Sequence, residues 1–329
     1  VRLRRRMRPS DTKGTRGGGA NAYTSPSEGG TDELGEYSAF VGVFSVGKVS
    51  GIVRRNTVRR TWFPASEAAL AAYESKHNVK MRFVIGKDPI LGAVPKEIVR
   101  EEALHGAFVH INVNEVYDNL KLKMMRYFTT VPKLFNARYY LKVDDDTYFR
   151  PDRIALVVPQ WEKRSADYIG CSMRGGDMMD KPDRRYYDPQ RHLIHGSRYF
   201  QYHAGPAYAM SRRAVRLLAS VPDGGLRFWG AGDASFGAWM LAFNVTHLED
   251  RRLCSPNCNE INALAHWGNC NGLCGPSKAM LLAHKGTCGT EPAIPRGMQE
   301  LPWKPWASFN STKEKCHQIH GDWLDHSRC

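Results

Sequence analysis

The sequence contains no uninterrupted apolar run of roughly 18 residues, the length that a membrane-spanning helix needs. It also has no internal repeat and no motif typical of an RNA- or DNA-binding domain, although its net charge is +14. Five of its arginines lie within the first eight residues, and the other basic residues are scattered. We therefore expect no nucleic-acid partner, because a basic surface equally suits an anionic diphosphate substrate or a membrane face. Since the chain begins with Val1 rather than methionine, we expect any membrane anchor to lie upstream.

Cysteine is almost missing from the first 250 residues, where only Cys171 occurs. The remaining seven cysteines are Cys254, Cys258, Cys270, Cys274, Cys288, Cys316 and Cys329. An even, clustered set of cysteines and two N-glycosylation sequons, at Asn244 and Asn310, favour disulfides in an oxidising secretory compartment. The Cys-x3-Cys spacings at 254–258 and 270–274 leave a zinc site as the alternative. The sequence does not specify which cysteines pair.

Composition divides the chain into three regions. Residues 1–37 are rich in Arg, Gly, Ser and Thr, which predicts a disordered stem. Residues 38–288 alternate apolar and polar stretches and are long enough for a large core. Residues 289–329 form a tail that contains tryptophan and cysteine. We expect one folded domain between a stem and a tail.

Strand and helix patterns alternate within the central region. Short runs rich in β-branched and aromatic residues predict strands at 38–46, 79–86, 107–113, 139–143, 168–171, 199–210 and 244–248. Helices are expected at 48–62, 95–105, 119–131, 151–161, 212–220 and 234–240, and a long loop at 173–196. Such alternation predicts an α/β fold in which helices flank a mostly parallel central sheet.

Three adjacent carboxylates, Asp144, Asp145 and Asp146, directly follow the strand expected at 139–143. Neighbouring anions repel one another unless a cation lies among them, and oxygen ligands suit Mg²⁺, Mn²⁺ or Ca²⁺. The carboxyl end of a strand is where open α/β sheets bind ligands. The run therefore predicts a divalent cation that holds the diphosphate of a nucleotide-sugar. The alternative is a solvated acidic loop without function.

Two further patterns point to the same ligand. Arg55 and Arg59 are four residues apart, so on a helix they share one face and could grip a phosphate. The alternative is an ordinary solvated basic helix. Gly205 interrupts an extended segment, which indicates a close approach of the backbone to a ligand.

Ser211 is suited to cap the helix that follows it.

Five segments, taken together, resemble one family of enzymes. They are Arg55-x3-Arg59-Arg60-Thr61-Trp62, Arg82-Phe83-Val84-Ile85-Gly86, Glu115-x-Tyr117-x-Asn119-Leu120-x-x-Lys123, Leu141-Lys142-Val143-Asp144-Asp145-Asp146 and His203-Ala204-Gly205-Pro206-Ala207-Tyr208-Ala209-Met210-Ser211. Their order and spacing resemble the β-1,3-galactosyltransferase family, which includes Fringe-type enzymes and β-1,3-N-acetylglucosaminyltransferases. The likeness is greatest to plant-type members and covers about residues 39–288.

The resemblance implies a GT-A-type nucleotide-sugar-binding domain with a cysteine-rich C-terminal extension. It also implies a UDP-sugar donor, Mn²⁺, inversion at the anomeric carbon, a glycan or glycoprotein acceptor, and a lumenal position in the Golgi apparatus. Within the site, Asp146 and Asp144 would bind the metal, with either His266 or His284 as a further ligand. Asp144, Asp145, Arg55, Arg59, Lys123 and Gly205 would bind the donor, whereas His203 is expected to support the fold.

The family's catalytic base is the aspartate of a Glu-Asp pair that precedes a helix. Here the pair reads Gly232-Asp233, so the aspartate is kept and the glutamate is lost. The resemblance implies that Asp233 takes the proton of the acceptor hydroxyl; the alternative is that Asp233 caps the helix. Galactose transfer is the expected activity. Transfer of N-acetylglucosamine, or binding of a nucleotide-sugar without turnover, are the alternatives.

Overall fold

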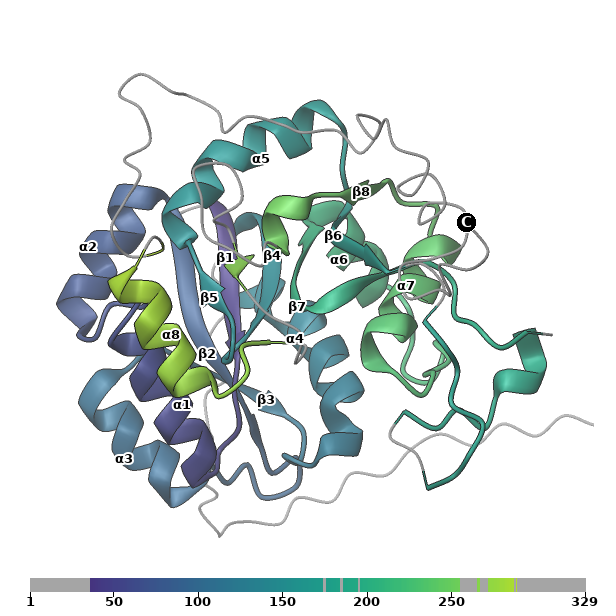
Figure 1. Cartoon of the computed structure of the whole chain (residues 1–329), viewed down its shortest axis with the longest axis horizontal. Helices are drawn as coiled ribbons and strands as arrows, with labels where there is room; N and C mark the ends of the chain where they lie inside the picture. Colours follow the sequence, from purple (N-terminus) through teal and green to yellow (C-terminus); the bar gives the residue numbers. More distant parts are fainter. Residues whose placement is uncertain are drawn as a thin grey trace, which may run out of the picture. The chain divides into compact units, whose positions relative to one another are not determined.

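A seven-stranded mixed sheet with the strand order β3-β2-β1-β4-β7-β6-β8 organises the computed structural model (Figure 1). The structure describes residues 36–173, 176–183, 186–194, 196–254, 265–266, 272–286 and 288. The strands of this sheet are β1 (Tyr37–Phe44), β2 (Val79–Lys87), β3 (Phe108–Asn112), β4 (Ala137–Asp144), β6 (Tyr168–Met173), β7 (Tyr202–Ser211) and β8 (His247–Glu249). A second, two-stranded sheet pairs β5 (Tyr148–Phe149) with β9 (Ala265–His266).

Four of the six strand pairings in the large sheet are parallel, which confirms the expected mostly parallel α/β fold. The exception is β7, which runs antiparallel to both of its neighbours, β4 and β6. In the register of β4 and β7, Lys142 lies opposite Tyr208 and Val143 lies opposite Ala207. The residues that begin β7 therefore lie beside those that end β4, so Gly205 is brought to the carboxyl end of the acidic strand.

Two apolar cores cover the two faces of the sheet, because successive side chains of a strand point to opposite faces. Ala39, Val41 and Val43 of β1 face one core, and Phe40 and Phe44 face the other. The helices that pack on the first face are α1 (Val49–Arg59), α2 (Glu67–His77), α5 (Ile154–Lys163) and α8 (Pro276–Lys285). The second face is covered by α4 (Leu120–Leu134), α6 (Arg212–Ala219) and α7 (Gly232–Ala242), and α3 (Lys96–His105) lies beside α1 (Figure 1).

The expected elements of the large sheet are present with shifts of a few residues at their ends. The helix expected at 151–161 is divided into the 3₁₀ turn η2 (Pro151–Arg153) and α5. Three further 3₁₀ turns are η1 (Tyr117–Asn119), η3 (Arg191–Ile194) and η4 (Arg251–Leu253). The predicted cap of α6 is confirmed, since Ser211 Oγ accepts a hydrogen bond of 3.1 Å from the Ala214 amide. The sequence patterns missed α2, α8 and the pairing of β5 with β9.

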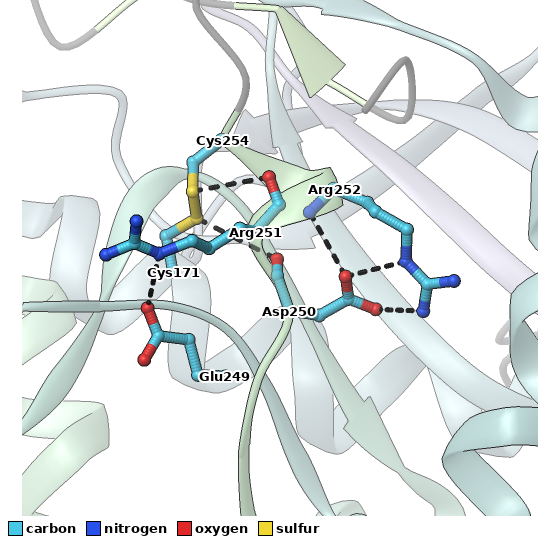
Figure 2. The surroundings of a disulfide bond; sticks show 6 residues. All are labelled: Cys171, Glu249, Asp250, Arg251, Arg252 and Cys254. Carbon is cyan, nitrogen blue, oxygen red and sulfur yellow. Dashed lines mark hydrogen bonds and ion pairs between the residues drawn. A yellow bond between two sulfur atoms is a disulfide. The ribbon is translucent and has the colours of Figure 1, made fainter. Parts of the chain in front are cut away.

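A disulfide joins Cys171 in β6 to Cys254, which follows η4 (Figure 2). Cys274 and Cys288 are also disulfide-bonded. The zinc alternative is therefore wrong for these four cysteines, because a disulfide sulfur is not available as a thiolate ligand. Cys258, Cys270, Cys316 and Cys329 lie outside the described residues, as do residues 1–35 and the tail at 289–329.

A buried ion pair adjoins this disulfide. Figure 2 shows the guanidinium of Arg252 clasping the carboxylate of Asp250, with Nη2 to Oδ2 at 2.6 Å and Nε to Oδ1 at 2.8 Å. Trp161 of α5 donates its indole N–H to the same carboxylate at 2.8 Å. The disulfide and this pair together fasten the segment after β8 to both the sheet and α5.

Within the described residues, no helix has both the length and the apolar character needed to cross a bilayer.

Candidate active site

The three aspartates form a tight turn at the end of β4. The Thr147 amide donates to the carbonyl of Asp144 at 3.2 Å, and the Asp145 amide donates to the carbonyl of Phe44 at 3.2 Å. The indole N–H of Trp62 donates to the Thr147 carbonyl at 3.1 Å, which closes the turn from the α1 side. The run is therefore a fixed part of the sheet edge rather than a solvated loop.

Asp145 is the buried member of the run and is fully engaged by the protein. Its carboxylate accepts hydrogen bonds from Ser45 Oγ at 2.6 Å and from Arg54 Nη1 at 3.0 Å. The same Arg54 nitrogen lies 3.8 Å from Asp146 Oδ2. Because Arg54 spans two of the three carboxylates, it supplies positive charge at the β1–α1 edge of the site.

Asp144 faces the other way, toward β7, and pairs with a buried lysine. The ammonium of Lys142 lies 2.7 Å from Asp144 Oδ1 and donates a second hydrogen bond to the carbonyl of Gly205. Burial raises the pKa of Asp144 to about 7, against the lowering effect of Lys142, and the negative charges of Asp146 and Asp233 raise it further. An additional cation beside Asp144 would therefore stabilise its ionised form.

Asp146 has an oxygen that no described residue satisfies. Its Oδ1 atom is buried and has no hydrogen-bond partner among the described residues. Burial, followed by the charge of Asp145, raises the pKa of Asp146. The segment around residue 272 covers it, since the Leu273 amide donates to the Asp146 carbonyl at 2.8 Å and a Cβ on Gly272 would fall 2.6 Å from Oδ1. A buried carboxylate oxygen without a partner is costly unless a cation or water occupies the space beside it.

Asp233 belongs to the same cluster, although 87 residues separate it from Asp146 in the sequence. It is the second residue of α7, whose N-cap is Ala231, so Asp233 is not the helix cap. A Cβ on Gly205 would fall 2.6 Å from Asp233 Oδ2, and Asp233 Oδ1 is buried without a partner among the described residues. Burial raises its pKa, while Lys142 lowers it. Gly205 is required because the carboxylate of Asp233 occupies the space of a side chain.

Arg55 and Arg59 lie on one helix face, as expected, but that face is buried against α3. Both pair with Glu101, Arg55 at 2.6 Å and Arg59 at 2.5 Å. Arg55 reaches the aspartates only through Ser45, to whose Oγ it donates at 2.8 Å. The geometry therefore gives these two arginines a supporting position, and the guanidinium that directly contacts the aspartates is that of Arg54.

Lys123 is also buried beneath the site rather than presented at its surface. Its ammonium donates to the Ser45 carbonyl at 2.6 Å and to Glu115 at 2.7 Å. Burial lowers its pKa, and the charges of Glu115 and Asp145 act in the opposite direction. Lys123 thus fixes the end of β1 behind Asp145.

Three histidines were singled out by the sequence: His203, His284 and His266. His203 is fully buried, its Nε2 lies 3.1 Å from the Tyr168 carbonyl, and burial lowers its pKa to about 3. His284 Nδ1 lies 2.8 Å from the hydroxyl of Tyr148. The backbone of His266 pairs with Tyr148, two residues after the acidic run, and its side chain lies outside the described part of the chain. Among the described side chains, no set of three or more His, Cys, Asp and Glu residues is arranged to hold a metal ion.

Sequence reasoning missed Lys142 and Arg54. Lys142 lies two positions before Asp144, so on a strand both point to the same face, and this spacing could have identified the pair. Arg54 adjoins Arg55 on a different face of α1, and only the packing of α1 decides which face meets the aspartates.

Comparisons with known proteins show the family to which the chain belongs. The model of the galactosyltransferase family matches residues 53–251, from α1 to η4. A protein of Arabidopsis thaliana described as probable beta-1,3-galactosyltransferase 12 is 37% identical over 245 residues, which are 74% of this chain and 65% of that protein. Probable beta-1,3-galactosyltransferase 13 of the same plant is 34% identical over 259 residues, covering 78% of this chain and 74% of that protein. The chain belongs to the galactosyltransferase family, and it spans about two thirds to three quarters of these two relatives.

Proposed function

We propose that the protein transfers galactose from UDP-galactose to a glycan or glycoprotein acceptor, in β-1,3 linkage and with inversion at the anomeric carbon. The names of the relatives support the sugar and the linkage. The single observation that carries the proposal is the shared cluster of Asp144, Lys142, Gly205 and Asp233. It sets a candidate base beside the carboxylates that would face the donor diphosphate.

The carboxylates fit a divalent cation, Mn²⁺ or a similar ion. Asp146 has an unpartnered buried oxygen, and burial together with neighbouring anions raises the pKa of both Asp146 and Asp144. Asp146 would hold the ion with Asp144 beside it, and donor phosphate oxygens and water would complete the shell, as is common for Mg²⁺-like ions. When bound, the ion would supply positive charge that stabilises the leaving diphosphate.

The chain's own residues would do the remaining chemistry. Asp233 accepts the proton of the acceptor hydroxyl while that oxygen forms a bond to the anomeric carbon and the bond to the UDP oxygen breaks. Lys142 binds both Asp144 and the Gly205 carbonyl, and this keeps Asp233 and the acidic run in fixed positions relative to each other. Arg54 pairs with Asp145 and lies near Asp146, so these two residues would hold the carboxylates on the side of the site that faces the donor diphosphate.

Gly232, in place of the family's glutamate, is compatible with this role for Asp233. A Cβ at Gly232 would lie 3.2 Å from Met124 Sδ and 3.4 Å from Lys121 Cβ, so α7 packs closely on α4 there. A side chain at this position would require Met124 and Lys121 to shift by a few tenths of an ångström.

The test is transfer by purified protein with Mn²⁺, a galactose-terminated acceptor, and UDP-galactose or UDP-N-acetylglucosamine. We expect a β-1,3-galactosylated product, identified by NMR, and a loss of kcat of about 10²–10⁴-fold in Asp233→Asn. Asp146→Asn should lose both activity and Mn²⁺ binding measured by electron paramagnetic resonance. Asp223→Asn, at an exposed aspartate, is the control. Donor binding without turnover by the unaltered protein, or full turnover in the presence of chelator, would contradict the proposal.

A lumenal site in the Golgi apparatus belongs to the same proposal. The disulfides at Cys171, Cys254, Cys274 and Cys288 and the exposed sequon residue Asn244 support an oxidising secretory compartment. Sensitivity of the expressed protein to a glycosidase that removes N-glycans, reduced in Asn244→Gln and lost when Asn310→Gln is added, would test the compartment.

A further inference from the structure

Two exposed tyrosines from distant parts of the chain meet at the surface. Tyr117, in η1, and Tyr186, in the loop between β6 and β7, have ring centroids 6.4 Å apart and ring planes inclined by 53°. Their relative exposures are 52% and 38%, which are high for large rings that contact each other. The two rings therefore form a small aromatic surface that faces solvent.

The segments that carry the two tyrosines both contact the residues that immediately precede Asp233. Directly after η1, Lys121 of α4 donates from Nζ to the Trp229 carbonyl at 3.4 Å, and its Cβ would lie 3.4 Å from a Cβ on Gly232. On the other side, a Cβ on Gly230 would lie 2.7 Å from the Tyr186 carbonyl oxygen. The chain segments that carry the two rings thus border residues 229–232, which lead directly to Asp233, whereas Arg54 and Asp145 lie on the β1–α1 side.

Hydrogen bonds to Asp188 connect the chain just after Tyr186 to the segment that precedes Asp233. The buried carboxylate of Asp188 accepts hydrogen bonds of 2.9 Å from the Gly230 amide, from the Tyr199 hydroxyl and from the Gln190 amide. Tyr186 itself has φ of +67°, a left-handed conformation that is uncommon for a bulky side chain. Such strain persists only where the surroundings enforce it, and it is found preferentially at functional sites.

We propose that Tyr117 and Tyr186 form a platform on which a pyranose ring of the acceptor glycan stacks while its hydroxyl is presented to Asp233. The identity of this ligand rests on the proposed transferase function. A sugar ring has an apolar face of C–H groups and a rim of hydroxyls, and tyrosine offers an apolar ring with a polar tip that suits both. Binding sites for small molecules commonly combine such aromatic walls with a few polar groups.

The first experiment separates acceptor from donor kinetics in Tyr117→Ala, Tyr186→Ala and the double variant. We expect the KM for a galactose-terminated acceptor to rise about five- to tenfold in each single variant, with the KM for UDP-galactose unchanged. Tyr117→Phe and Tyr186→Phe should keep most of the affinity, because they retain the ring. Phe200→Ala, at an exposed aromatic residue of the same loop outside the ring pair, is the matched control. An unchanged acceptor KM in the alanine variants, or an equal rise in the donor KM, would overturn the platform.

A second measurement does not depend on turnover. Saturation-transfer NMR of the acceptor with the unaltered protein should give signals from the C–H face of one ring, and these should weaken in the double alanine variant at an unchanged melting temperature. If the protein binds the glycan in this way but transfers no sugar, the proposed function fails and the platform stands. If it transfers galactose but the C–H signals persist in the double variant, the platform fails and the function stands.

Discussion

At the scale of single residues, Gly205 shows how closely the site is built. Its missing side chain leaves space for the carboxylate of Asp233, and its carbonyl oxygen accepts a hydrogen bond from the ammonium of Lys142. In Gly205→Ala the new methyl group would displace Asp233, and a misplacement of about 1 Å in a reacting group can cost about 100-fold in rate. We expect a loss of that order in kcat, measured at saturating donor and acceptor. Gly196→Ala, where the nearest atom to the new Cβ would be 3.8 Å away, should be neutral.

The protonation of Asp233 should set the acid limit of activity. A general base works only when deprotonated, so the rate is lost as the pH falls through its pKa. Burial raises that pKa above the usual aspartate range near 4, and Lys142 opposes the rise. The acid limb of kcat/KM should therefore lie above that of an ordinary aspartate, and Lys142→Met should move it to still higher pH. Lys133→Met, at an exposed lysine of α4, should leave the profile unchanged.

At the scale of secondary-structure elements, Glu101 of α3 fastens α1 to the fold. It pairs with both Arg55 and Arg59, and although burial opposes its charge, the hydrogen bonds from these arginines lower its pKa. Glu101→Gln would leave two buried guanidiniums short of a countercharge, and breaking a buried pair typically costs about 3–5 kcal/mol. We expect the free energy of unfolding in urea to fall by that order. Glu97→Gln, on the exposed side of α3, is the control, and equal stability of the two variants would contradict the clamp.

The helix α2 was missed because its sequence has no clear apolar period. In α2 only Leu70 and Glu74 are buried, so an alanine-rich helix leaves no clear stripe. The acidic run could be predicted because a strand and three carboxylates are adjacent in the sequence. The contact of Asp233 with Gly205 could not be predicted, since it depends on the packing of α7 on β7. The sequence also could not show that the side chains of Arg55 and Arg59 face α3, because the packing of α1 against α3 decides this.

At the scale of the whole molecule, the disulfide between Cys171 and Cys254 closes a long loop that includes Gly205 and Asp233. The two cysteines are 83 residues apart in sequence. In the chain-entropy model, a loop of this length stabilises the fold by about 4–5 kcal/mol. The double variant Cys171→Ser, Cys254→Ser should lose stability of that order in urea unfolding under non-reducing conditions. An unchanged midpoint would indicate that the Asp250–Arg252 pair alone holds this segment.

The opposed direction of β7 has a consequence for how such a protein can diversify. Because β7 runs antiparallel to both β4 and β6, these two strands end at the edge of the sheet where β7 begins, so the connection between β6 and β7 leaves and re-enters the sheet at the edge that carries the aspartates. The described part of this connection includes Tyr186 and Phe200, whereas the paired residues of β4 and β7 hold the aspartates. If the proposed function holds, substitutions in the connection should change selectivity for the acceptor and leave the residues proposed for the nucleotide-sugar in place.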